Sequence, residues 1–105
     1  MTPADGGSAT TGIMAGPMER TLTIQNQKGL HARAAAKLAK LAAGFKSKIN
    51  VSRGGQTVTA TSIMGLMMLA AAPGCEIVVY TEGSDAAEAM AAIQALVDDK
   101  FEEDS

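Results

Sequence analysis

The chain has 105 residues, a formal net charge of −2 and a hydrophobic fraction of 47%, which is the size of one domain with a single core. The slight acidity gives no electrostatic footprint for nucleic acid, and no apolar run reaches the length of about 18 residues that a membrane span needs. One cysteine, Cys75, excludes an internal disulfide and forms no metal site with a single histidine, so neither a metal nor a cofactor is expected.

The two ends of the chain differ in composition from its middle. Residues 1–18 are rich in Gly, Ser, Thr, Ala and Pro, which predicts a disordered tail, and they lack the basic and apolar regions of a signal peptide. A cytoplasmic location is therefore expected. Residues 19–98 form the predicted domain, and residues 99–105 are expected to be a solvated acidic tail.

Four segments are predicted to be β-strands. Apolar and polar residues alternate over 19–25, 48–53 and 56–60, and Gly54-Gly55 between the last two predicts a tight hairpin turn. Residues 76–81 are apolar on both faces, which predicts a central strand.

Three segments have the period of helices. The first follows His31, the second is a short apolar stretch opened by Ser62, and the third is capped by Ser84 or Asp85. Glu88 has capping-box spacing from Asp85. The order β-α-β-β-α-β-α predicts an α+β fold in two layers, with three helices covering one face of a four-stranded antiparallel sheet.

His31 is the only histidine, and it precedes a run of strong helix formers. The imidazole is therefore expected at the start of a helix, where unpaired backbone N–H groups, here of Ala32 and Arg33, favour an anion. The Arg33 guanidinium could add a charge-assisted fork, and a neutral imidazole is a competent nucleophile. These residues indicate a histidine that carries a phosphoryl group, although a lone histidine near a helix start is more often an ordinary surface or capping residue.

Two motifs, Gly29-Leu30-His31-Ala32-Arg33 and Ser62-Ile63-Met64-Gly65-Leu66-Met67, closely resemble the HPr family. These are the phosphocarrier proteins of the bacterial phosphoenolpyruvate-dependent phosphotransferase system, and their fold is an open-faced sandwich. The family usually has proline after the arginine, where this chain has Ala34. Because alanine also suits a first helical turn, we expect looser preorganisation without loss of function.

The resemblance implies that His31 accepts a phosphoryl group on Nδ1 from phosphorylated enzyme I and passes it to an enzyme IIA protein or domain in sugar transport. It also implies that Ser62 is a regulatory site for HPr kinase/phosphorylase. Some of Ile63, Met64 and Met67 are expected to remain on the surface, and the three are expected to be adaptable contacts for these partners, although they could simply be core residues. The expected form is a monomeric carrier that takes part in phosphotransfer without being a stand-alone enzyme.

Two other functions remain open at this point. One is a carrier in a regulatory, nitrogen-type phosphorelay without sugar transport. The other is a non-phosphorylated adaptor that binds a regulator through a methionine-rich patch, made of Ile63, Met64 and Met67. A stand-alone hydrolase is disfavoured because the sequence offers no second base, no cysteine–histidine pairing signal and no metal cluster.

Overall fold

One four-stranded antiparallel sheet forms the base of the molecule in the computed structural model, which describes residues 17–103. Its strands are β2 (Met18–Thr23), β3 (Lys48–Arg53), β4 (Gln56–Thr59) and β5 (Glu76–Glu82), in the spatial order β2-β5-β3-β4. All four predicted strands are present, and β5 is central as predicted. Gly54 and Gly55, both with positive φ (58° and 84°), make the tight turn between β3 and β4.

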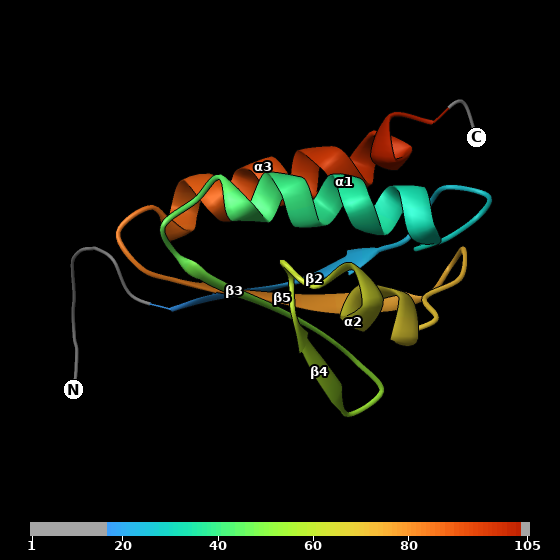
Figure 1. The fold of residues 1–105 in the computed structure, drawn as a ribbon, viewed down its shortest axis with the longest axis horizontal. Helices are drawn as coiled ribbons and strands as arrows, with labels where there is room; N and C mark the ends of the chain where they lie inside the picture. The colour runs from blue at the N-terminus through green and yellow to red at the C-terminus, as the bar shows by residue number, and fades with distance from the viewer. Residues whose placement is uncertain (1–16, 104–105) are drawn as a thin grey trace.

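Three helices complete the fold: α1 (Ala32–Ala43), α2 (Ile63–Met68) and α3 (Ala86–Asp98). The first and third run side by side over one face of the sheet (Figure 1), and α2 packs against α1 and β4. The predicted open-faced α+β sandwich in the order β-α-β-β-α-β-α is therefore confirmed. No helix within residues 17–103 is long and apolar enough to cross a membrane.

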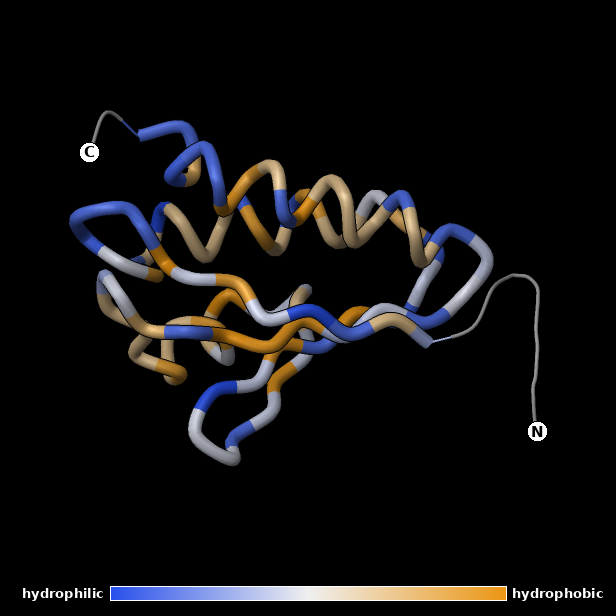
Figure 2. The backbone as a smooth tube through the Cα atoms, turned by 180° about the vertical axis from the view of Figure 1, so that it is seen from behind, coloured by the Kyte–Doolittle hydropathy of each residue, from blue (hydrophilic) through white to orange (hydrophobic). Residues whose placement is uncertain are grey.

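The core lies between the helices and the sheet, and Figure 2 shows that hydrophobic residues concentrate in these elements while the turns are hydrophilic. Ile77 and Val79 of β5 are fully buried on the covered face. On the other face Val78 is half-buried and Tyr80 is 37% exposed. The helices thus cover one face of the sheet, as predicted, and the second apolar face of β5 is left partly open to solvent.

The start of α3 differs in detail from its prediction. Asp85 is the N-cap residue, but its side chain makes no bond to the helix, so no capping box with Glu88 forms. The Asp85 carboxylate instead accepts hydrogen bonds from the backbone amides of Lys46 and Ser47, both at 2.8 Å, and from the Ser47 hydroxyl. The carboxylate that the local sequence pattern predicts as a helix cap is therefore used in a tertiary contact with the segment before β3.

The chain after α3 also differs from the expected solvated tail at residues 99–105. It forms the short 3-10 turn η2 (Lys100–Glu102), in which Phe101 is fully buried and is among the largest buried side chains. All three residues of η2 have positive φ (56°, 55° and 65°), so the turn is left-handed and returns the chain toward α1. The tail prediction is wrong for residues 99–103, because burial of one aromatic side chain outweighs the polar composition around it.

The predicted tails otherwise lie outside the described residues. The residues of the tails that the structure does not describe are 1–16 and 104–105. Of the segment 1–18, the structure describes only Pro17 and Met18, and Met18 already belongs to β2.

Candidate functional site

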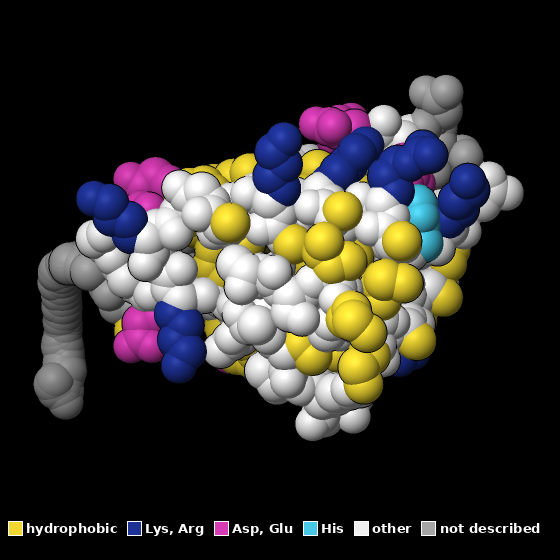
Figure 3. All heavy atoms as spheres, in the orientation of Figure 1, with side chains coloured by type: hydrophobic (Ala, Val, Ile, Leu, Met, Phe, Trp, Pro, Cys, Tyr) yellow, Lys and Arg dark blue, Asp and Glu magenta, His cyan; other side chains and the backbone are white. Residues whose placement is uncertain are grey.

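His31 lies at the N-cap of α1, the open end of the helix. Its backbone is extended (φ −79°, ψ −178°), and its side chain makes no capping hydrogen bond. The imidazole is 26% exposed. In Figure 3 it is seen (cyan) on the surface, next to basic side chains (dark blue) and above a hydrophobic area (yellow). The ring is therefore accessible to a reactant from solvent.

The first amides of α1 lie at the same helix end as the imidazole. The Ala35 amide donates to the His31 carbonyl at 2.8 Å, so the amides of Ala32 and Arg33 precede the first hydrogen bond of the helix. No carbonyl four residues earlier within the helix can accept from them. With the positive end of the helix dipole they favour an anion at this place.

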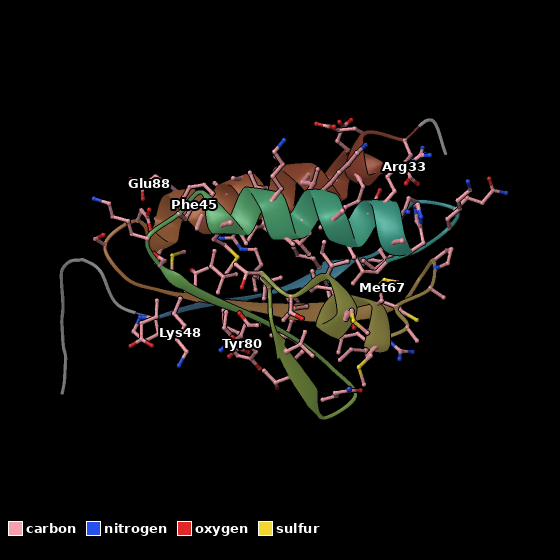
Figure 4. The ribbon with its side chains drawn as sticks, viewed as in Figure 1. Arg33, Phe45, Lys48, Met67, Tyr80 and Glu88 are labelled. Carbon is pink, nitrogen blue, oxygen red and sulfur yellow. The ribbon has the colours of Figure 1, made fainter. Side chains whose placement is uncertain are left out.

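Arg33 is exposed on the first turn of α1, and within residues 17–103 its guanidinium forms no hydrogen bond or ion pair. Figure 4 shows its side chain at the N-terminal end of the helix. It is thus free to bind an incoming anion. Ala34, where the HPr family usually has proline, is fully buried in the same turn, and the helix begins without irregularity.

Gly29 shapes the loop that delivers His31. Its φ is +67°, and a Cβ at this position would lie 2.4 Å from the Ala71 carbonyl oxygen. The same oxygen accepts a hydrogen bond from the Leu30 amide at 2.8 Å. Glycine is therefore required here both by the left-handed backbone and by the close approach of the neighbouring loop.

The imidazole has a partner that the sequence did not indicate. His31 Nε2 lies 2.5 Å from Oε2 of Glu103, in the segment expected to be a tail. The hydrogen bond to His31, together with one from Asn26, lowers the pKa of the Glu103 carboxyl against the opposing effect of burial. Glu103 is therefore a carboxylate at neutral pH and can only accept, so Nε2 carries the proton and donates it.

Asn26 joins this contact to the loop before the helix. Its Nδ2 donates to the Gly29 carbonyl at 2.7 Å and to Glu103 Oε1 at 3.1 Å. Both neighbours are acceptors, so the NH₂ group must face them. Its Oδ1 is buried and has no hydrogen-bond partner among residues 17–103. The fully buried Asn26 thus holds the Gly29 turn and the Glu103 carboxylate in one arrangement.

Ser62 is the N-cap of α2, as predicted, and its Oγ accepts a hydrogen bond from the Gly65 amide at 3.0 Å. The side chain is half-buried. Gly65 fits closely against it, because a Cβ there would lie 3.1 Å from both Ser62 Oγ and Val58 Cβ. The hydroxyl therefore has a structural function as the cap of α2.

The methionine-rich patch is exposed on α2, which packs against α1 (Figure 4). Ile63 is 42% exposed, Met64 75% and Met67 43%, which confirms that these residues remain on the surface. Met68, at 66%, also belongs to the patch, although we did not predict it. Its spacing of four residues from Met64 was the available signal, because such residues share one face of a helix.

The structure therefore brings His31, Ala32 and Arg33 together at one helix end. Asn26 and Glu103 are the site residues that sequence reasoning missed. The only available signal for the C-terminal segment was Phe101, one of two phenylalanines in the chain, in otherwise charged surroundings.

Comparison with known proteins agrees with this geometry. The family model PTS-HPr, described as the PTS HPr component phosphorylation site, matches residues 18–99. A phosphocarrier protein HPr of Cupriavidus necator is 50% identical over 86 residues, covering 82% of this chain and 97% of the relative. A phosphocarrier protein NPr of Shewanella violacea is 48% identical over 88 residues, covering 84% and 97%.

Solved structures agree as well. A crystal structure of HPr-C-His from Thermoanaerobacter tengcongensis matches with a TM-score of 0.80 and 40% identity, over 84% of this chain and 99% of that one. Another structure from the same organism is described as an HPr dimer. The chain belongs to the HPr/NPr family of phosphocarrier proteins of the phosphotransferase system.

Proposed function

We propose that this protein carries a phosphoryl group on His31, accepting it from phosphorylated enzyme I and passing it to an enzyme IIA protein or domain. The observation that carries the proposal is the partly exposed imidazole at the N-cap of α1, beside the open amides of Ala32 and Arg33. The chain's membership of the phosphocarrier family supports it.

The attachment atom in this proposal is Nδ1. Two observations support Nδ1 as this atom. Nε2 already makes a hydrogen bond with Glu103, whereas Nδ1 has no hydrogen-bond partner among residues 17–103 and keeps its lone pair. Phosphoryl transfer through a loose transition state needs mainly alignment and charge stabilisation. The helix amides and the Arg33 guanidinium can supply both to the phosphoryl oxygens.

Partner docking is proposed for the methionine-rich patch of Ile63, Met64, Met67 and Met68. These side chains are exposed on a helix that packs against α1, and flexible thioethers adapt to different surfaces. The same patch can therefore serve enzyme I and enzyme IIA in turn.

The carrier is proposed to act as a monomer, which sedimentation of the purified chain tests directly.

Regulation is proposed at Ser62, by an HPr kinase/phosphorylase. A phosphate at this N-cap would add a charge of about −1.5 to −2 beside the patch and hinder partners that present acidic groups. Incubation with such a kinase tests this point, and absence of phosphate on Ser62 would remove it.

A nitrogen-type phosphorelay is the second candidate function, and the 48% identity to an NPr favours it. It uses the same chemistry on His31 with a different cognate enzyme IIA. Transfer assays with sugar-specific and nitrogen-type enzyme IIA proteins distinguish the two, because the physiological acceptor should be served faster.

The central experiment is incubation with enzyme I and phosphoenolpyruvate. We expect an acid-labile phosphate on His31 in the wild-type protein and none in His31→Gln. Labelling of both proteins, or of neither, would contradict the proposal, and lack of labelling would favour a non-phosphorylated adaptor.

A further inference from the structure

The C-terminal segment brings a carboxylate to the phosphoacceptor ring, and the following inference rests on the proposed function. Residues 31 and 103 are 72 positions apart, yet Nε2 and Oε2 are separated by 2.5 Å. The Glu103 side chain is only 13% exposed. This contact is therefore built into the fold and differs from a surface ion pair, which contributes little.

Two hydrogen bonds and one buried side chain hold the carboxylate in place. Phe101 is fully buried, and its carbonyl accepts a hydrogen bond from Lys37 Nζ of α1 at 2.8 Å. The pair that Lys37 also makes with Oε1 of Glu102, at 3.5 Å, is exposed to solvent and contributes little. Asn26 donates to the Glu103 oxygen that His31 does not use. Figure 1 shows the C-terminal turn beside the N-terminal end of α1, where these contacts occur.

We propose that Glu103 is a positioning residue for phosphoryl transfer, which holds His31 with the proton on Nε2 and stabilises the ring when Nδ1 takes the phosphoryl group. A carboxylate that accepts from one ring nitrogen leaves the other as the nucleophile and fixes the ring plane. A buried aspartate acts on the histidine of serine hydrolases in the same physical way.

The transfer step balances with this assignment. The Nδ1 lone pair forms a bond to phosphorus, and the bond from phosphorus to the donor nitrogen breaks, leaving its electron pair on the donor. His31 keeps the Nε2 proton, so its ring becomes a cation that faces the Glu103 carboxylate. The phosphoryl group is attached at the other ring nitrogen, where the amides of α1 and the Arg33 guanidinium can face its charge.

A direct chemical donor tests the proposal without a partner protein. Phosphoramidate contains the same P–N bond, so the rate at which it phosphorylates His31 reports the ring alone. We expect Glu103→Gln to slow this reaction about tenfold, the effect of weakening one charge-assisted hydrogen bond in the charged product. Glutamine has one amide oxygen, so it can accept from His31 or from Asn26 but not from both.

Glu102→Gln is the matched control. It removes the same charge one residue earlier, from a side chain that is 64% exposed, and should leave the rate within about twofold of wild type. A wild-type or faster rate in Glu103→Gln would overturn the proposal, the faster rate showing that the carboxylate blocks the ring. Equal slowing in both variants would overturn it as well, because the effect would then come from net charge.

Proton NMR tests separately whether Nε2 carries the proton and donates it to Glu103 in solution. We expect a downfield resonance for the hydrogen-bonded Nε2 proton in wild type and Glu102→Gln, and its loss or upfield shift in Glu103→Gln. Its absence from the wild-type spectrum would overturn the proposal. If phosphoramidate labels His31 with the expected dependence on Glu103 while enzyme I does not, the proposed function fails and the positioning role stands.

Discussion

Gly29 and Ala71 lie in such close contact that the loop before His31 has no room for a side chain. A Cβ at Gly29 would be 2.4 Å from the Ala71 oxygen, at a residue whose φ is +67°. Two loops that are distant in sequence are in contact at this point, and this contact fixes the position of His31.

The first prediction follows from that contact. Gly29→Ala should lower the free energy of unfolding by about 2–4 kcal/mol, because backbone strain adds to the loss of the Leu30–Ala71 hydrogen bond. Gly55→Ala is the control: its φ is +84°, but nothing lies within 4 Å of the added Cβ, so only the strain of about 1–2 kcal/mol applies. Urea denaturation measures both, and equal losses would contradict the steric argument.

The second prediction concerns Arg33. Arg33→Ala should slow transfer from phosphorylated enzyme I by about tenfold or more, because the guanidinium would no longer stabilise the phosphoryl charge. The fold should be unchanged, since the side chain is exposed and has no partner within residues 17–103.

Two substitutions complete that test. Arg33→Lys should recover part of the rate, because lysine keeps the charge but lacks the fork. Lys40→Ala, which removes an exposed charge farther along α1, should have little effect. A wild-type rate in Arg33→Ala would show that its assigned function is wrong.

Ser62 caps α2, and two substitutions separate this structural function from the proposed regulatory one. Ser62→Ala should lower the free energy of unfolding by about 1 kcal/mol through loss of the N-cap, with transfer to enzyme IIA nearly unchanged. Ser62→Asp keeps a capping oxygen and adds a negative charge, so it should retain stability and slow transfer between proteins. Thermal unfolding and transfer kinetics measure the two effects, and unimpaired transfer in Ser62→Asp would argue against regulation at this site.

Asp85 gives a prediction about pH. Hydrogen bonds from the Ser47 hydroxyl and the Lys46 amide lower the pKa of its carboxyl below the ordinary value of 3.8. A group with a lowered folded pKa adds stability that is fully present above its unfolded pKa and is lost as pH falls through its folded pKa. Asp85→Asn should therefore reduce stability near neutral pH and flatten its decline below about pH 4.

Calorimetry or urea denaturation between neutral and acidic pH checks this prediction. Glu88→Gln, on the exposed side of the same helix, is the control and should change the profile little. If Asp85→Asn had the wild-type acid profile, the loop contact would contribute nothing to stability.

Local features were determined by the sequence alone. The periods of the strands and helices, the Gly54-Gly55 turn and the Ser62 cap each depend on residues within a few positions of one another, and the structure contains them all. His31 belongs to this group, because a run of helix formers after it places it at a helix start. Its resemblance to a known motif adds the proposed chemistry.

Only the tertiary structure decided which distant groups meet. Asp85 accepts from Ser47, 38 residues away, although its local spacing favoured a capping box. Glu103 reaches His31 because Phe101 is buried and a left-handed turn reverses the chain, and neither follows from an acidic composition. The physical reason is that such pairings depend on burial of particular side chains against the whole core, whereas a local pattern records only neighbours along the chain.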